Sequence, residues 1–236
     1  MKKFAILGVA LFSGLFFAAG CGGGSSSSSK TAQLRVVNAV DGPVYNVLVG
    51  GASFATNLGF KGATSYASVA SGSEQIEFRG TTGSTSDVIN STVSLTGASN
   101  YSFVAIGSNV VSGVLFTDQN TAATSGDFDL RVINAATSLG PADVYVVPST
   151  GNCGDPAYLF TVSANISGLN IGQASGYKQF TAGSFNVCVT AHDAKSLLLQ
   201  SGVTAYTSGQ VGTIIVTDSD GNLPLQIITM TDVAGS

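Results

Sequence analysis

Charge is the property that this sequence has least of. Only 9% of the 236 residues are charged, whereas a typical soluble protein has about 25%. The nine Lys and Arg side chains form no cluster along the chain, so the sequence predicts no nucleic-acid partner, because phosphate binding requires grouped cations. Tryptophan is absent and His192 is the single histidine, which excludes copper or zinc centres built from several histidines.

Long hydrophobic runs are also missing, with one exception near the N-terminus. Residues 4–17 are almost continuously apolar, follow Lys2 and Lys3, and lead through small residues to Cys21. This run is typical of a secretory signal, because a membrane span needs about 20 apolar residues. We interpret residues 1–20 as a signal peptide and Cys21 as the acylated first residue of a lipoprotein. An ordinary signal peptide with an incidental cysteine is the alternative, because Ala18 stands where the cleavage box usually has Leu.

The segment after Cys21 supports this interpretation. Residues 22–29 read GGGSSSSS, so we expect residues 21–32 to form a flexible tether between a lipid bilayer and the folded part. Gly22, rather than Asp, resembles bacterial lipoproteins that are passed to the outer membrane. For a Gram-negative host we therefore expect a cell-envelope location at the outer membrane. Loss of Lys2 and Lys3 with the signal would change the formal net charge from -4 to -6.

The rest of the chain is rich in strand signals. Hydrophobic residues make up 44% of the sequence, which excludes a disordered chain. Residues 75–79 and 185–190 alternate polar and apolar side chains, whereas residues 101–106 and 213–216 are more continuously apolar, as in central strands. Residues 193–200 are compatible with a helical turn, but their counterpart at 87–95 is strand-like, so we expect a strand in both. The sequence predicts an all-β fold.

An internal repeat divides this β-rich region. The motif LRVVNA at 34–39 returns as LRVINA at 130–135, an offset of 96. Further matches are Tyr66 with Tyr177, at an offset of 111, and residues 115–118 with 229–232. We predict two tandem β-sandwiches of about seven antiparallel strands, over residues 33–120 and 127–236, each with its own core and joined by the polar residues 121–126.

The order of these repeated elements resembles a bacterial envelope family known as domain of unknown function 4397. The resemblance rests on the two LRV[VI]NA strands and on the two segments that run from a Tyr to a Gly, residues 66–72 and 177–183. It covers most of residues 33–232. It implies an immunoglobulin-like or transthyretin-like β-sandwich and no particular activity. In this family an Asp commonly opens the second strand; Asp143 fits that pattern, but Asn46 stands there in the first copy.

Cys153 and Cys188 remain once Cys21 is assigned to lipid. An even pair in an oxidising compartment predicts a disulfide. The offset of 111 places Cys188 at the position of Glu77, on the polar face of its strand, so we expect Cys188 to point away from the core. Cys153 lies where the offset grows from 96 to 111, so the bond would pin an inserted loop across the outer face of a sheet.

No motif indicates a reaction. Neighbours along a strand point to opposite faces, so Asp193 is poorly placed to orient His192 for hydrolysis, and the G-x-S-x-G motif is absent. A copper site at Cys188, His192 and Met230 would lack a second histidine. Asp218 and Asp220 resemble the start of a calcium loop without its distal Glu. We favour a hairpin turn there, with a weak cation site as the alternative, and we expect no cofactor.

Two further residue pairs recur with the repeat. Arg35 and Arg131 lie at equivalent places in apolar strands, either as structural partners of carboxylates or as ligand-binding cations; we favour the first. Tyr66 and Tyr177 begin equivalent strands, and we expect their hydroxyls to bond nearby backbone, as corner tyrosines do.

Anchor, tether and duplication together indicate a non-enzymatic cell-envelope lipoprotein whose two modules serve binding, adhesion or structural assembly. Its expected partners are the bilayer, through acylated Cys21, and an envelope or extracellular protein or polysaccharide. The alternatives are a surface-anchored hydrolase acting on an envelope or extracellular polymer, and a small-ligand carrier with a pocket between sheets or domains.

Overall fold

The computed structural model describes residues 30–81, 87–108, 110–219 and 222–235. These residues form seventeen strands and one short helix, so the all-β prediction is confirmed. None of their helices is both long and apolar enough to span a bilayer. The predicted signal peptide, Cys21 and residues 22–29 of the tether lie outside the described residues.

The first sandwich consists of two four-stranded sheets. One contains, in order, β4 (Ala67–Ala70), β1 (Thr31–Asn38), β7 (Asn100–Gly107) and β8 (Val111–Asp118). The other contains β3 (Ala52–Leu58), β2 (Tyr45–Val49), β5 (Gly72–Gly80) and β6 (Asp87–Leu95). Leu34, Phe78 and Phe103 are among the fully buried side chains between them.

The second sandwich follows the same plan. Its first sheet contains β12 (Lys178–Thr181), β9 (Asp127–Asn134), β16 (Val211–Ser219) and β17 (Asn222–Val233). Its second contains β11 (Ile166–Leu169), β10 (Ala142–Pro148), β13 (Gly183–Ala191) and β14 (Leu197–Gln200), with β15 (Thr204–Tyr206) also paired to β13. Leu130, Val187 and Ile214 belong to the core between these sheets.

Three details differ from the sequence predictions. Each sandwich contains one parallel pair, β1 with β7 and β9 with β16; strands of the opposite sheet separate the members of each pair in sequence, so no tight hairpin makes them antiparallel. The described residues form eight strands in the first sandwich and nine in the second, rather than seven. Finally, β1 begins at Thr31, inside the predicted tether, because Thr31 and Ala32 pair with β4.

The repeated Asn of the two LRV[VI]NA motifs links the sheets of each sandwich. Asn38 Nδ2 donates to the carbonyl of Leu58 at 3.2 Å, and Asn134 Nδ2 donates to the carbonyl of Leu169 at 2.9 Å. Both side-chain oxygens accept a bond from the backbone N–H two residues further on. Because Asn38 ends β1 and Leu58 ends β3, this bond ties the first sheet to the second.

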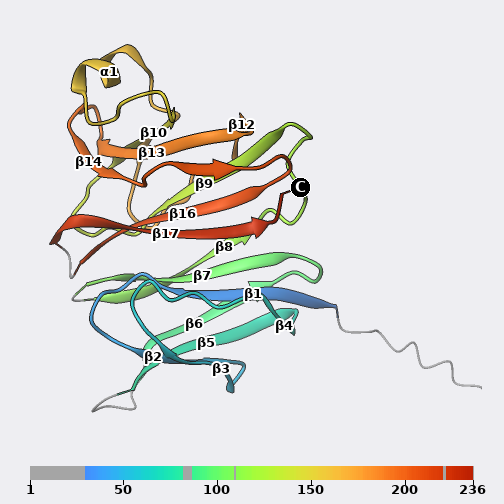
Figure 1. The fold of residues 1–236 in the computed structure, drawn as a ribbon. Helices are drawn as coiled ribbons and strands as arrows, with labels where there is room; N and C mark the ends of the chain where they lie inside the picture. Colours follow the sequence, from blue (N-terminus) through green and yellow to red (C-terminus); the bar gives the residue numbers. More distant parts are fainter. Residues whose placement is uncertain (1–29, 82–86, 109, 220–221, 236) are drawn as a thin grey trace, which may run out of the picture.

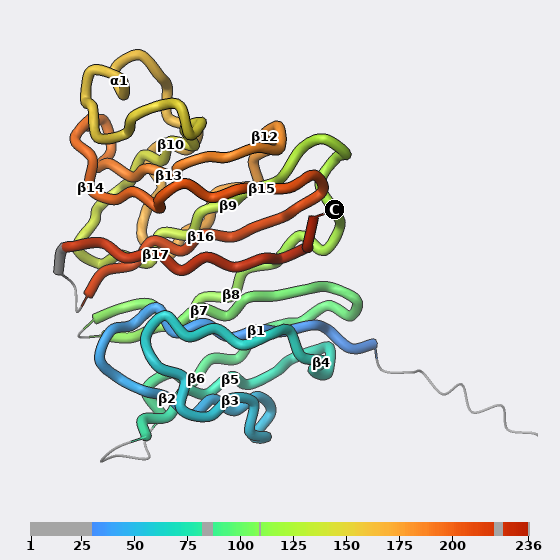
Figure 2. The backbone as a smooth tube through the Cα atoms, viewed as in Figure 1, coloured from blue at the N-terminus to red at the C-terminus, as the bar shows by residue number. Residues whose placement is uncertain are grey.

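The four sheets are stacked in one column, as Figures 1 and 2 show, with the β1 and β9 sheets facing each other in the middle. A third apolar cluster lies between these central sheets and includes Val37, Val104, Ile133 and Ile215. Strands β1, β7, β9 and β16 are therefore covered on both faces, which explains their continuously apolar sequences. The sandwiches have separate cores, but they also share this third one.

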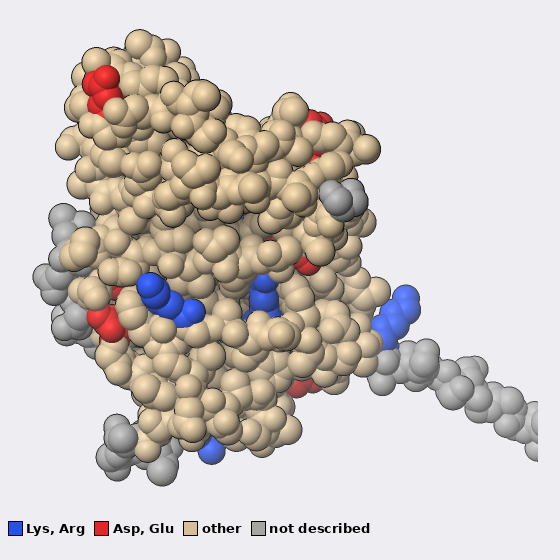
Figure 3. Space-filling view, in the orientation of Figure 1, with Lys and Arg blue, Asp and Glu red and all other residues tan. Residues whose placement is uncertain are grey.

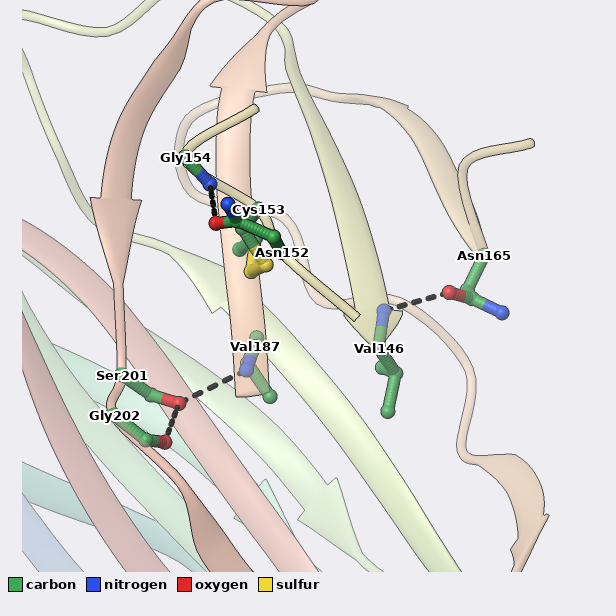
Figure 4. The surroundings of a disulfide bond; sticks show 9 residues. Val146, Asn152, Cys153, Gly154, Asn165, Val187, Ser201 and Gly202 are labelled. Carbon is green, nitrogen blue, oxygen red and sulfur yellow. Dashed lines mark hydrogen bonds between the residues drawn. A yellow bond between two sulfur atoms is a disulfide. The ribbon is translucent and has the colours of Figure 1, made fainter. Parts of the chain in front are cut away.

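The second sandwich has an inserted segment, residues 149–165 between β10 and β11, which lies over its outer sheet (Figure 1). It contains α1 (Pro156–Thr161), which Asp155 caps by accepting a bond from the Ala157 N–H. The Cys153–Cys188 disulfide attaches the segment to β13, with a Cα–Cα distance of 6.2 Å (Figure 4). The predicted disulfide is confirmed.

The predicted orientation of Cys188 is confirmed, but it is not exposed. Cys188 is paired with Tyr145 in the register where Glu77 is paired with Leu48, and it lies on the face opposite Val187 and the main core. Its exposed fraction is 0% because the inserted segment covers it. Cys153, Tyr145 and Leu159 complete this small outer core.

Candidate functional site

The densest group of polar side chains lies between the two sandwiches. Arg35 of β1 forms an ion pair with Asp232 at the end of β17, and Arg131 of β9 pairs with Asp118 at the end of β8. Arg35 also lies 3.6 Å from Asp118. The exposed fraction of each of these four side chains is at most 4%. Each arginine thus reaches across the interface to a carboxylate of the other sandwich.

The same strands supply hydroxyl partners for these charges. Ser102 on β7 accepts a bond from Arg35 Nε at 2.7 Å and donates to Asp118 at 2.6 Å. Thr213 on β16 accepts from Arg131 Nε at 2.9 Å and donates to Asp232 at 2.6 Å. Because the hydroxyl and the arginine are direct neighbours in the parallel pairs β1–β7 and β9–β16, the parallel register places them in contact.

Tyr66 and Tyr177 complete the arrangement. The Tyr66 hydroxyl donates to Asp118 at 2.5 Å, and the Tyr177 hydroxyl donates to Asp232 at 2.6 Å. Each ring also lies against an arginine, with 4.7 Å from the Arg35 guanidinium carbon to the centroid of Tyr66. The expectation that these hydroxyls bond nearby backbone is wrong for Tyr66, whose hydroxyl bonds Asp118 instead. The Tyr177 hydroxyl does bond backbone, since it accepts from the Gln119 N–H at 3.3 Å in addition to its bond with Asp232. The prediction that the arginines are partners of carboxylates is confirmed.

Electrostatics keep both tyrosines protonated. Burial raises the pKa of Tyr66, and the negative charge of Asp118 raises it further. Burial also raises the pKa of Tyr177; Arg131 opposes that change, whereas the charge of Asp232 adds to it. Both hydroxyls therefore serve as hydrogen-bond donors at physiological pH.

This network has no free group with which to bind substrate or start a reaction. Both arginines and both aspartates are committed to ion pairs and hydrogen bonds. A pocket of about 300 Å³ opens beside Arg35 at the seam, lined also by Thr64, Tyr66 and Met230. The guanidinium at its wall is already neutralised by Asp232. The geometry fits a joint between modules.

His192 has a partner that the sequence did not indicate. Its Nδ1 lies 2.8 Å from Asp143 Oδ1, whereas its Nε2 lies 3.5 Å from Asp193. The nearby Ser167 hydroxyl donates to Asp143 at 2.9 Å and lies 3.5 Å from the same Nδ1. In a hydrolytic triad the serine contacts the nitrogen opposite the aspartate, so this arrangement is not a triad.

Asp143 orients this corner of the second sandwich. Burial raises the pKa of Asp143, but hydrogen bonds from His192, from the Gly168 N–H and from Ser167 outweigh burial, and the net shift is downward. The hydrogen bond with Asp143 raises the pKa of His192; partial burial opposes it, and the charge of Asp193 adds to it. Asn46 makes the equivalent contact in the first sandwich, because its side-chain oxygen accepts a bond from the Asn57 N–H at 3.1 Å, as Asp143 accepts from the Gly168 N–H.

The weak cation site is not supported at Asp218. This side chain is buried and accepts bonds from the Ser138 N–H at 2.5 Å and the Thr137 hydroxyl at 3.2 Å. It therefore fastens a loop of its own sandwich. Asp220, the second residue of that candidate, lies outside the described residues. Ser219 is opposite Asn222 in the β16–β17 pair, which agrees with a hairpin.

Sequence reasoning missed Asp118 and Asp232 as partners of the arginines. Both aspartates end the repeated segments 115–118 and 229–232, and both arginines belong to the repeated LRV[VI]NA motifs. A repeated acid and a repeated base in a chain with only 9% charged residues were the available signal. The missing information was that the copies face each other.

Fold and site together define a two-module all-β protein with a polar joint. Residues 32–145 match the model of the family described as "Domain of unknown function (DUF4397)", so the chain carries a DUF4397 domain. The matched range covers the first sandwich, crosses the joint and ends within β10. No curated protein matches the chain.

Proposed function

We propose that this chain is a non-enzymatic lipoprotein of the cell envelope that presents two joined β-sandwiches for binding, adhesion or structural assembly. The observation that carries the proposal is the use of the repeated Arg, Asp and Tyr side chains within the joint. A repeated set that could have formed two ligand sites instead fastens one module to the other. The two sandwiches thereby form a single elongated body (Figure 1).

The surface and the N-terminus agree with this role. The face drawn in Figure 3 carries few Lys, Arg, Asp or Glu atoms, as expected for a chain with 9% charged residues. Such a surface offers mainly hydroxyl, amide and backbone groups, which suit contacts with polysaccharide or protein better than with a polyanion. The N-terminal segment would supply the lipid anchor through Cys21 and, in a Gram-negative host, an outer-membrane location.

The anchor is tested by Cys21→Ser. We expect the variant to leave the membrane fraction, or to accumulate with its signal still attached, because no thiol remains to be acylated. Gly22→Ala is the matched control, since it alters the same segment and keeps the thiol. Fractionation with mass spectrometry of the N-terminus provides the measurement. A Ser variant that stays membrane-bound with its signal removed would refute the lipoprotein assignment.

The binding role is tested by crosslinking on intact cells. A photo-crosslinker placed at exposed Phe160 or Val203 should recover a defined envelope protein or polysaccharide. A control with the crosslinker at buried Phe103 should recover none. Turnover of an extracellular polymer by the purified chain, with no stable partner recovered, would favour the hydrolase alternative.

A further inference from the structure

The two sandwiches also differ at the end where β4 or β12 meets the opposite sheet. Strand register aligns the positions: Ala32 faces Val69 in β1–β4 as Phe128 faces Phe180 in β9–β12. Gly72 faces Leu95 in β5–β6 as Gly183 faces Tyr206 in β13–β15. The four positions are Ala32, Val69, Glu74 and Leu95 in the first sandwich and Phe128, Phe180, Phe185 and Tyr206 in the second.

In the second sandwich this end is filled with aromatic rings. The centroid of Phe128 lies 4.3 Å from that of Tyr206, 5.4 Å from Phe180 and 5.3 Å from Phe185. Phe128 is fully buried at the centre of the group. Burial raises the pKa of Tyr206 to about 12, in keeping with a ring enclosed by the others.

In the first sandwich an opening lies beside two of these positions, Val69 and Glu74, whereas Ala32 and Leu95 are buried in the core. A pocket of about 420 Å³ lies between the β2–β3 turn, β4 and the start of β5, with Val49, Phe54 and Val69 as its apolar walls and Ser53, Ser68 and Glu74 as polar ones. Its volume falls within the range of about 300–1,000 Å³ of small-molecule sites. Figure 2 shows β3 and β4 in the lower sandwich and β12 and β15 in the upper one.

Glu74 gives this pocket a charge without a counter-charge. Its carboxylate has no hydrogen bond or ion pair with any of the described residues, whereas Glu77 on the same strand is paired with Arg79. The side chain folds over the β2–β3 turn, since a Cβ added at Gly50 would lie 2.8 Å from Glu74 Oε2. A partly buried carboxylate of this kind favours a cation beside it.

We propose that the open end of the first sandwich binds a small molecule that joins an aromatic ring to a protonated amine. The ring takes the space that Phe180 and Phe185 fill in the second sandwich, and the ammonium group donates to Glu74. The site concerns the soluble part of the chain alone, so it stands or falls independently of the lipid anchor and of any macromolecular partner.

The first test is a titration with phenethylamine as the probe. The full chain carrying Cys21→Ser would be used, since lipid and detergent would compete for an apolar pocket. We expect saturable binding at millimolar concentrations, because so small a ligand makes few contacts, with NMR shift changes at Ser68, Val69 and Glu74. Ethylamine lacks the ring and should not bind; 2-phenylethanol lacks the charge and should bind more weakly.

Two variants separate the ring from the charge. Val69→Phe copies the second sandwich, so the chain itself shows that the fold accommodates it, and it should abolish binding of both aromatic probes. Val88→Phe, on the exposed face of β6, is the matched control and should leave binding unchanged. Glu74→Gln should weaken phenethylamine about fivefold, the range for a partly exposed ion pair, without changing the affinity for 2-phenylethanol.

Three results would overturn the proposal. They are the absence of saturable phenethylamine binding up to about 10 mM, well beyond the millimolar range, binding that Val69→Phe leaves intact, and shift changes confined to residues outside the pocket. If Val69→Phe does not fold, the Glu74→Gln titration and the location of the NMR shifts still decide the outcome.

Discussion

In the first sandwich, β2 (Tyr45–Val49) alternates buried and half-buried side chains, whereas in the second the equivalent β10 (Ala142–Pro148) is buried at every position but the last. The first outer face is closed by an ion-pair group, in which Arg79 contacts Glu77 and Asp87. The second is closed by the inserted segment and its disulfide. Strands in the same register therefore present a polar outer surface in the first sandwich and one side of an additional apolar core in the second. The inserted segment that covers the second sheet makes this difference.

The central sheets show the opposite behaviour. There the two copies are nearly equivalent, since each contributes an Arg, an Asp, a Tyr and a hydroxyl residue. In both copies the Arg donates to the hydroxyl residue and the Tyr donates to the Asp. Buried ion pairs seldom stabilise a fold more than apolar packing would, but they penalise wrong arrangements strongly. We infer that this network fixes how the sandwiches face each other, while the apolar cluster around it supplies the driving force.

Removal of Asp118 should give the largest effect on this comparison. Asp118 accepts bonds from Arg131, Tyr66 and Ser102 and also lies near Arg35. Asp118→Ala would leave buried guanidinium charge uncompensated and should lower the free energy of unfolding by about 3–5 kcal/mol. Chemical denaturation of the full chain provides the measurement.

The matched variant Asp232→Ala sharpens the result. Among the described residues, Asp232 is paired with one guanidinium, that of Arg35, so its loss should cost less than the loss of Asp118. Asp87→Ala, which removes a carboxylate from the exposed Arg79 group, should change stability far less than either. Equal small losses for all three variants would show that the interface network contributes nothing specific.

Reduction of the disulfide should affect only the second sandwich. Cys153 and Cys188 are separated by 35 positions, so the bond is expected to contribute about 3–4 kcal/mol in the chain-entropy model. Hydrogen exchange should increase in residues 149–165 and along β13 after reduction. The first sandwich serves as an internal control, and equal loosening of both would contradict the assignment of the bond to the local cover.

The smallest expected effect is a pH dependence confined to the second sandwich. The pKa of His192 is raised above 6.5 by Asp143, so its contribution to stability is complete below 6.5 and is lost as the pH rises through the higher folded value. The pKa of Asp143 is lowered, so its contribution is present above 3.8 and is lost as the pH falls through the folded value.

NMR titration of the single histidine tests this directly. The midpoint should lie above 6.5 in the native chain and should move toward that value in Asp143→Asn. The first sandwich has uncharged Asn46 at the equivalent position, so its local stability should not change over the same pH range. A native midpoint below 6.5 would mean that burial outweighs the carboxylate.

Several features could be read from the sequence because they depend on local patterns. The alternation at residues 75–79 predicts which side chains of β5 enter the core, and Ile76 and Phe78 are indeed fully buried. The offset of 111 assigned Cys188 to the face opposite Val187, as found. The strand at 87–95 matches β6, whereas only the latter half of 193–200 is a strand, because the chain turns at Asp193 with a positive φ of 60°.

The side-chain contacts that the sequence did not reveal join segments far apart in the chain. The carboxylate partners of Tyr66 and Tyr177 lie 52 and 55 positions away, and no local rule brings them together. The pairing of His192 with Asp143 spans 49 positions. To predict the complete burial of Cys188, one would have to know where the inserted segment, which has no counterpart in the first copy, lies on the sheet.

The sequence by itself determined the β class, the duplicated plan and the core face of the alternating strands at 75–79 and 185–190, because side-chain periodicity and turn residues act within a few positions. Only the tertiary structure decided that the β1 and β9 sheets face each other, that repeated charges neutralise across this contact, and that one sandwich end is filled while the other is open. These outcomes depend on which apolar surfaces remain after each sheet has formed, and burial of such surface carries no directional signal along the chain.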